Sequence, residues 1–390
     1  MDDASYSPAR DKNGKIIYTY NQDLQLTTPK RLLEEFTAPD TWETSFWKNP
    51  QGHTVRFGTC IPPADTPVKG VMFYMVGAME FMENDFETFR DLNNRGYAVV
   101  SYDPFGQGCS DRAHFNHTYT CPKPYNEYGD DAAGILRDIV HPFKEKHAPN
   151  GVLVGHGKSQ GGNHMLHMLH DHPDHGLDKI VLTSPLIDLP PFAQLRKFGV
   201  VLPYARLLEA SGAFSKAASP LDKLRSLSSK APVPLPDFHV KDADFSGSAQ
   251  GRATIRTKWI ATNPQLANYI VTSQWMREAY KGCTRVQQKD FLDKINDEIL
   301  IIKGVRDPIV FRPAIKKLHN HLKNSSLLEV DGKHNTYIED DKTRNQALHV
   351  MEEYIDDNWP NIKSLRPAEH VPKDDSTLLP LGQPLPDPAL

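Results

Sequence analysis

Cysteine, long apolar stretches and an excess of positive charge are all scarce in this sequence. The four cysteines (Cys60, Cys109, Cys121 and Cys283) are scattered and form no CxxC pair, so they do not suggest a disulfide framework. Buried free thiols are the ordinary interpretation, although Cys109 and Cys121 could pair in an oxidising compartment. The formal net charge of -4 supplies no basic field for a phosphate backbone, which argues against a nucleic-acid partner.

Membrane and targeting signals are equally scarce. No apolar run approaches the ~18 residues needed to span a bilayer, so we expect no transmembrane segment. The first residues, MDDASYSPARDKNGK, are polar and lack the apolar core of a signal peptide. We therefore expect a globular, cytoplasmic protein, unless a leader has been removed. The 390 residues suffice for one large domain or two ordinary ones.

Short apolar runs closed by turn residues dominate the middle of the chain. Two alternating runs, WETSFW and HTVRFGTCI, are joined by the turn residues NPQG and predict a β-hairpin. Further runs, apolar on both faces, lie at 71–76, 97–102, 151–155, 179–184, 298–304 and 326–330. Helical patterns separate most of them, as in the three-residue spacing of Phe86, Phe89 and Leu92. This alternation predicts a doubly wound α/β domain with a mostly parallel sheet.

The alternation also suggests domain boundaries. Residues 190–289 contain proline-rich joints and helical segments without a convincing strand, and we interpret them as a helical cap inserted into the sheet domain. The two parts of that domain are then 42–189 and 290–362. Residues 1–41 lack periodicity and are predicted to form an N-terminal extension. The proline-rich tail, 363–390, is predicted to have no fold of its own.

The most informative residues directly follow the apolar run GVLVG. The sequence GKSQG (157–161) fits G-x-S-x-G at a strand-to-helix turn, where a strained backbone between small residues exposes a serine. This placement predicts Ser159 as a nucleophile. The same residues match the end of a P-loop, but that motif requires glycine where the chain has Val152, so nucleotide binding is disfavoured.

A serine nucleophile needs a base, and the base needs a group that orients it. In this type of sheet the chain order is nucleophile, acid and histidine. Asp307 follows the apolar run EILIIKG, and His334 lies in a glycine-containing loop after SLLEV. We predict Asp307 as the orienter and His334 as the base. Asp331 is a less favoured orienter because it lies so close to His334 in sequence.

Acyl transfer also needs two N–H donors aimed at the developing oxyanion. The turn after the nucleophile aims the Gln160 N–H at the substrate oxygen. We expect the second donor in VGAMEF, where we choose the Ala78 N–H, with Gly77 permitting close approach of the backbone. Three further residues are predicted to line the substrate pocket: Met79, Lys158 and Trp275.

Histidines crowd the segment after the turn: His164, His167, His170, His172 and His175. The first three repeat every three residues, as metal ligands on one helix face would. No carboxylate or cysteine completes a zinc pattern, and hydrogen-bonded or partly exposed histidines are the favoured interpretation. We therefore predict no metal site, and the expected chemistry requires no cofactor.

Taken together, the motifs VGAMEF, YDPFGQGCSDR, GHGKSQGG, GVRDPIV and DGKHNTYIEDDKTR resemble the α/β-hydrolase superfamily. The pattern is most similar to the branch of monoacylglycerol lipases, bacterial lysophospholipases and serine aminopeptidases. The resemblance implies an α/β-hydrolase fold, with a mostly parallel, doubly wound sheet of about eight strands and a helical cap after the sixth strand. It implies the same triad and oxyanion donors: Ser159, Asp307, His334, Ala78 and Gln160.

The sequence departs from the family pattern in two places. The branch usually has HG where this chain has VG (76–77), and HSMG where it has KSQG (158–161). A cation at Lys158 beside the nucleophile would bias the site toward acidic or polar acyl groups. The departures leave the expected chemistry intact but bear on specificity for lipids.

The expected function is hydrolysis of a small-molecule carboxylic ester, with lysophospholipids, monoacylglycerols and simpler esters as candidate substrates. Two alternatives stay open. A peptidase or amidase could use the same triad, but it would need a cage of carboxylates for a free amine. A catalytically silent binding protein could share the fold, although the complete triad argues against it. A dehalogenase is disfavoured because its nucleophile would be an aspartate at position 159.

Overall fold

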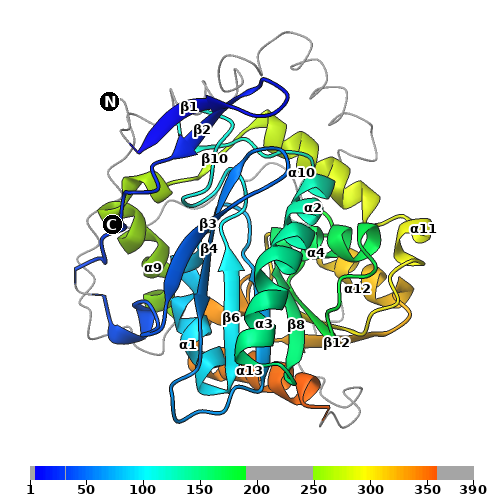
Figure 1. Cartoon of the computed structure of the whole chain (residues 1–390). Helices are drawn as coiled ribbons and strands as arrows, with labels where there is room; N and C mark the ends of the chain where they lie inside the picture. The colour runs from blue at the N-terminus through cyan, green and yellow to red at the C-terminus, as the bar shows by residue number, and fades with distance from the viewer. Residues whose placement is uncertain (1–4, 31, 190–248, 358–390) are drawn as a thin grey trace, which may run out of the picture.

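An eight-stranded sheet forms the centre of the protein, whose computed structural model describes residues 5–30, 32–189 and 249–357 (Figure 1). The strand order is β12-β11-β9-β8-β5-β6-β4-β3. The bounds are β3 Glu43–Lys48, β4 Thr54–Cys60, β5 Gly70–Met75, β6 Tyr97–Tyr102, β8 Val152–Lys158, β9 Lys179–Thr183, β11 Ile299–Gly304 and β12 Ser325–Val330. The predicted hairpin β3–β4 is antiparallel, as is the pair β4–β6, and all other neighbours in the sheet are parallel. The predicted mostly parallel sheet is therefore confirmed.

Helices cover both faces of this sheet because its central strands are apolar on both sides. In β5, Val71, Phe73 and Met75 face one hydrophobic core, and the alternate residues Met72 and Tyr74 face the other. The first core is closed by α2 (Tyr125–Ile135), the π-helical turn η3 (Leu136–Val140), α3 (His141–His147), α4 (Gln160–Asp171), α10 (Ser273–Arg285), α11 (Lys289–Leu292) and α12 (Arg312–His321). The second is closed by α1 (Phe86–Asn94), α9 (Ala249–Thr262) and α13 (Asp341–Ile355). Figure 1 shows α2, α3 and α4 on the near side of the sheet.

The segment predicted as an N-terminal extension contains a β-hairpin of its own. Strands β1 (Tyr6–Arg10) and β2 (Ile16–Tyr20) pair antiparallel, and a short 3-10 turn, η1 (Glu34–Phe36), follows. Tyr18 exchanges both backbone hydrogen bonds with Arg112, at 2.8 and 2.9 Å. The buried Arg112 guanidinium also donates hydrogen bonds to the Gly106 and Gly108 carbonyls. Tertiary contacts therefore stabilise two strands that are too short to show a periodic pattern in the sequence.

The described part of the predicted cap begins at α9, and residues 190–248 lie outside the described residues, as does the predicted tail. The chain leaves the sheet after β9, the sixth strand, and returns to it at β11, which agrees with the expected insertion point. After η5 (Pro264–Leu266), the two-residue strand β10 (Ile270–Val271) pairs with β7 (Tyr119–Thr120). The expectation of no strand in 190–289 was therefore wrong at this one place, where two paired residues are too few to give a sequence signal.

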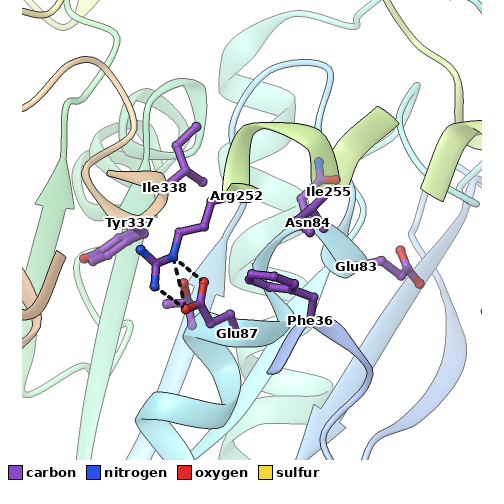
Figure 2. A pocket seen from close by; sticks show the side chains of 9 residues that line it. Phe36, Glu83, Asn84, Glu87, Arg252, Ile255, Tyr337 and Ile338 are labelled. Atoms are coloured by element: carbon purple, nitrogen blue, oxygen red, sulfur yellow. Dashed lines mark hydrogen bonds and ion pairs between the residues drawn. The ribbon is translucent and has the colours of Figure 1, made fainter. Parts of the chain in front are cut away.

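Arg252 attaches helix α9 to the sheet domain. Its guanidinium donates to both carboxylate oxygens of Glu87 in α1, to Asp341 at 2.6 Å and to the Glu339 carbonyl at 2.7 Å. Figure 2 shows the bonds from Arg252 to Glu87 beside the ring of Phe36. The contacts tie α9 to both α1 and α13.

A second buried arginine, Arg56 in β4, joins segments that follow two neighbouring strands. Its Nε donates to Asp103 after β6 at 2.8 Å, and its two terminal nitrogens donate to Glu83 at 2.8 Å each. Glu83 belongs to η2 (Met82–Asp85), and Asp103 also accepts from the backbone N–H groups of Met82 and Cys109. All three charged side chains are buried, so each carboxylate depends on Arg56 for compensation.

We predict that Arg56→Leu will lower the free energy of unfolding by about 3–5 kcal/mol, because it leaves the carboxylates of Glu83 and Asp103 buried without a cation. The measurement is urea denaturation followed by circular dichroism. Arg137→Leu is the matched control: Arg137 pairs with Asp138 at the exposed surface, and its loss should cost less than about 1 kcal/mol. A loss at Arg56 no greater than that of the control would contradict the prediction.

Candidate active site

Ser159 lies on a sharp turn between β8 and α4. Its backbone is strained, with φ 52° and ψ -116°, a conformation that residues other than glycine rarely adopt. The turn requires glycine around it. A Cβ on Gly157 would lie 2.7 Å from the Gly162 Cα, and one on Gly161 would lie 2.5 Å from the Met75 carbonyl oxygen. The structure therefore has the strained strand-to-helix turn that the sequence predicted.

The structure brings Ser159, His334 and Asp307 together in one hydrogen-bonded chain. His334 lies in the loop after β12, with its Nε2 2.8 Å from Ser159 Oγ and its Nδ1 2.7 Å from Asp307 Oδ2. The other Asp307 oxygen accepts from the N–H groups of Ile309 at 2.7 Å and Val310 at 3.2 Å. An ionised carboxylate can only accept, so Nδ1 carries the imidazole proton and Nε2 is left to accept from the serine hydroxyl.

Asp331, the less favoured orienter, points elsewhere. Its carboxylate pairs with Arg306 at 2.8 Å, and its side chain is 75% exposed. Asp307 is buried, as a carboxylate must be to hold a histidine without competition from water. The geometry therefore favours Asp307 over Asp331 as the partner of His334.

Residues 76–81, which we call the oxyanion loop, connect β5 to η2. Side chains hold several of its polar backbone groups. The Gly77 N–H donates to Glu80 Oε2 at 2.8 Å, and the Met79 N–H, at φ 60°, donates to Gln107 Oε1 at 2.8 Å. The Gln107 amide in turn donates to the Gly77 carbonyl at 2.9 Å. A trans peptide points its N–H opposite its carbonyl, so fixing the Gly77 carbonyl also fixes the direction of the Ala78 N–H.

The two predicted oxyanion donors remain available. In the part of the chain that the structure describes, neither the Ala78 N–H nor the Gln160 N–H has a hydrogen-bond partner. Ser159 directly precedes Gln160 and lies close to the residue before Ala78, since a Cβ on Gly77 would be only 3.3 Å from the Ser159 Cβ. Two free N–H groups beside a serine hydroxyl are the arrangement that stabilises a tetrahedral oxyanion.

The sequence did not reveal Gln107 or Arg256 as parts of the site. Arg256, in α9, donates to the Met79 carbonyl at 3.0 Å and to the Asn268 carbonyl at 2.8 Å, so helix α9 also holds the oxyanion loop. Gln107 lies within the recognised motif YDPFGQGCSDR, which could have indicated it. Arg256 is one of many basic residues in a helix and has no such signal.

Of the residues predicted to line the pocket, Met79 lies in the oxyanion loop and Trp275 contacts the turn after the nucleophile. The indole Nε1 of Trp275, in α10, donates to Gln160 Oε1 at 3.1 Å, and the Tyr125 hydroxyl donates to the same oxygen at 2.9 Å. With two donors on its oxygen, the Gln160 side chain is held in one orientation. Trp275 therefore contacts the residue that follows the nucleophile.

Lys158 does not fit the hypothesis of a cation that attracts acidic acyl groups. Its ammonium lies 2.6 and 2.7 Å from the two Asp85 oxygens and 3.0 Å from Glu80, and its side chain is only 2% exposed. Burial, opposed by the Lys158 ammonium, raises the pKa of Asp85 to about 6. Against the cost of burial, Asp85 and Glu80 raise the pKa of Lys158. The positive charge is matched inside the protein rather than offered to a substrate.

The histidines after the turn make packing contacts. His164 is fully buried, stacks on Tyr128 with ring centroids 4.3 Å apart and meets the edge of Tyr125. His167 bonds to Arg285 at 2.6 Å. Across the described residues, no group of three histidine, cysteine, aspartate or glutamate side chains is placed to hold a metal ion.

Burial first, and then the neighbouring His167, lower the pKa of His164 well below its ordinary value. Burial likewise lowers the pKa of His156 and of His167 to about 3. Below about pH 6.5 the unfolded chain binds protons that these buried rings do not bind in the folded protein. The free energy of unfolding therefore falls as the pH is lowered.

We predict that His164→Phe, which keeps the aromatic stack, will reduce by one the number of protons that the chain takes up on unfolding in acid. The slope of unfolding free energy against pH should then decrease by up to about 1.4 kcal/mol per pH unit between pH 6 and 4. Urea denaturation across that range measures the slope. His172→Gln removes a more exposed histidine and is the control. An unchanged slope in His164→Phe would show that this ring titrates normally.

The cavity in Figure 2 lies apart from this chain of hydrogen bonds. Phe36, Glu87, Arg252 and Tyr337 are among its lining residues, and its volume is about 10 Å³, enough for roughly one water molecule. None of the predicted site residues lines it.

Among the described helices, none is both long and apolar enough to cross a membrane.

The sheet order, the covering helices and a strained serine turn after β8 define an α/β hydrolase. The chain belongs to the family described as serine aminopeptidase S33, whose model matches residues 66–341. The predicted superfamily and branch are therefore confirmed. No curated protein sequence matches the chain.

Solved structures similar to this chain support the fold. A soluble variant of monoglyceride lipase from Saccharomyces cerevisiae, in complex with a substrate analogue, is 16% identical with a TM-score of 0.58, and the match covers 87% of this chain and 99% of that one. A thermostable carboxyl esterase from Bacillus coagulans, in complex with glycerol, is also 16% identical with a TM-score of 0.58, covering 82% and 99%. The hypothetical protein PA2218 from Pseudomonas aeruginosa is 13% identical with a TM-score of 0.56, covering 86% and 100%.

Proposed function

We propose that this α/β hydrolase cleaves carboxylic esters through an acyl-enzyme on Ser159. The observation that carries the proposal is the continuous chain Asp307–His334–Ser159, with contacts of 2.7 and 2.8 Å, beside the free N–H groups of Ala78 and Gln160. Nucleophile, base, orienter and oxyanion donors are the complete set that acyl transfer needs.

In the first half of the reaction, Ser159 Oγ attacks the ester carbonyl carbon while His334 Nε2 takes the hydroxyl proton. The carbonyl oxygen becomes an oxyanion, which accepts from the Ala78 and Gln160 N–H groups. Asp307 stabilises the imidazolium without taking its proton. The tetrahedral intermediate then collapses, the bond to the alcohol oxygen breaks, and the alcohol leaves with the proton from His334.

The second half repeats these steps with water. His334 accepts a proton from a water molecule, whose oxygen attacks the acyl carbon of the Ser159 ester. Collapse of the second tetrahedral intermediate returns the proton to Ser159 Oγ and releases the carboxylic acid. No step calls for a group that the chain lacks.

An ester substrate is favoured over a peptide by the charges beside the site. A free α-amine would need unpaired carboxylates. The described carboxylates nearest the oxyanion loop, Glu80, Glu83 and Asp85, are all bonded to Lys158 or Arg56. Two of the similar structures are a monoglyceride lipase and a carboxyl esterase, which supports esters and lipid-like esters as the substrate class. The family description keeps a serine aminopeptidase as the second candidate.

We predict hydrolysis of p-nitrophenyl esters, measured from acetate to palmitate beside aminoacyl anilides. Ser159→Ala should lower kcat by about 10³-fold or more, because the remaining site can only bind and polarise the ester. The chain-length optimum separates a lipase-like site from a short-chain esterase. Cleavage of anilides alone would favour the peptidase, and no turnover by the wild type would favour a silent binding protein.

We also predict that Asp307→Asn will lower kcat by about 10³–10⁴-fold, because an amide can hold His334 in the wrong tautomer. KM should change little, since the substrate does not contact Asp307. Asp331→Asn is the matched control and should keep kcat within about twofold. Equal losses in the two variants would contradict the assignment of Asp307.

A further inference from the structure

Lys158 and Glu80 connect the nucleophile turn to the oxyanion loop. Lys158 is the last residue of β8 and directly precedes Ser159. Its ammonium lies 3.0 Å from Glu80 Oε2, and the same carboxylate oxygen accepts the Gly77 N–H at 2.8 Å. Only two side chains therefore separate the backbone beside the nucleophile from the backbone beside the predicted oxyanion donor Ala78.

The Glu80 contact restrains the one residue of the loop that has no side chain. Glycine has wide backbone freedom, so the peptide planes on both sides of Gly77 need external contacts to stay in place. Gln107 holds the plane that contains the Gly77 carbonyl and the Ala78 N–H, and Glu80 holds the preceding plane through the Gly77 N–H. Loss of either contact would free the Ala78 N–H to turn away from the site.

The Lys158 ammonium strengthens the contact from Glu80. Although burial alone would raise it, the ammonium lowers the pKa of Glu80 below its ordinary value, so this carboxylate stays ionised. Hydrogen bonds to an ionised acceptor are about twice as strong as neutral ones. The ammonium also donates to both Asp85 oxygens, and the Tyr74 hydroxyl donates to Asp85 Oδ1 at 3.3 Å. The ammonium is thus fixed in the position from which it reaches Glu80.

Both departures from the family pattern, at Val76 and at Lys158, lie next to these contacts. Val76 is apolar and fully buried, so its side chain cannot hydrogen-bond to the oxyanion loop. The polar contacts that hold the loop come instead from Glu80, Gln107 and Arg256. Lys158, the other departure, supports the first of them.

We infer that Glu80 and Lys158 are positioning residues: Lys158 holds the Glu80 carboxylate, and Glu80 fixes Gly77 so that the Ala78 N–H points at the developing oxyanion. The inference rests on the proposed ester hydrolysis and extends it to two side chains outside the triad. Their effect falls on the transition state, because the oxyanion exists only there.

The test is Glu80→Gln, which keeps the size of the side chain and removes its charge. We expect kcat for the preferred p-nitrophenyl ester to fall about 10- to 100-fold with KM within about twofold. Glu329→Gln is the matched control. Glu329 pairs with the buried Lys303 at 2.9 Å, on strands β12 and β11, and its exposure of 26% is close to the 21% of Glu80. The control should keep kcat within about twofold.

A second measurement separates positioning from stability. Ser159 Oγ adds to the carbonyl carbon of a trifluoromethyl ketone of matching acyl length, and its proton passes to His334. The product is a tetrahedral oxyanion, so the affinity of the ketone reports the oxyanion contacts. In Glu80→Gln its inhibition constant should rise by the same factor by which kcat falls, while the product acid binds unchanged. In a double-mutant cycle, Lys158→Met should add little to Glu80→Gln, because both act through one contact. If Lys158→Met does not fold, the Glu80→Gln measurements decide alone.

The outcomes separate this inference from the proposed function. Turnover absent from the wild type, or retained in Ser159→Ala, would overturn the proposed function and the inference with it. With Ser159→Ala inactive, unchanged kcat and inhibitor affinity in Glu80→Gln would overturn the positioning role only. A fall in both, with the Glu329→Gln control unaffected, supports it.

Discussion

The close approach of helix α4 to the end of β5 is the constraint on which the site depends. Gly161 has no room for a Cβ against the Met75 carbonyl, so the first turn of α4 can press against the start of the oxyanion loop. This contact sets Ser159 at positive φ and brings the nucleophile turn within van der Waals distance of Gly77. The remaining parts need only be added at the carboxyl ends of neighbouring parallel strands, where β11 supplies Asp307 and β12 supplies His334.

Buried charge is the second organising element, and it is compensated within the protein. Arg56 in β4 pairs with Glu83 and Asp103, and Lys158 at the end of β8 pairs with Glu80 and Asp85. The four carboxylates lie in the segments that follow β5 and β6. Such groups stabilise little by themselves, but removing one partner is costly because the others stay buried. They therefore specify where these segments lie more than they add to stability. Both groups meet on η2, directly after the oxyanion loop.

The sequence was sufficient for the parts of the structure that depend on local pattern. Buried parallel strands are continuous apolar runs, and the turn at Ser159 needs glycines at fixed offsets, so both could be predicted from neighbouring residues. Lys158 was misjudged because its partners, Glu80 and Asp85, are more than seventy positions away in the chain. The β1–β2 hairpin was missed for the same reason, because its support comes from the distant Arg112. The partners of Gln107, Gly77 and Met79, are nearer in the chain but still about thirty positions away. Charge pairing and hairpin docking are tertiary properties, and a residue's type does not reveal its distant partner.

The hydrogen bond from Trp275 to Gln160 has a thermodynamic consequence for helix α10. Through this bond α10 contacts the residue whose N–H is a predicted oxyanion donor. Coupling between two such sites is reciprocal. If docking of α10 strengthens the binding of an acyl group through Gln160, the bound acyl group stabilises the docked α10 by the same free energy. Occupation of the site and docking of α10 are therefore thermodynamically coupled.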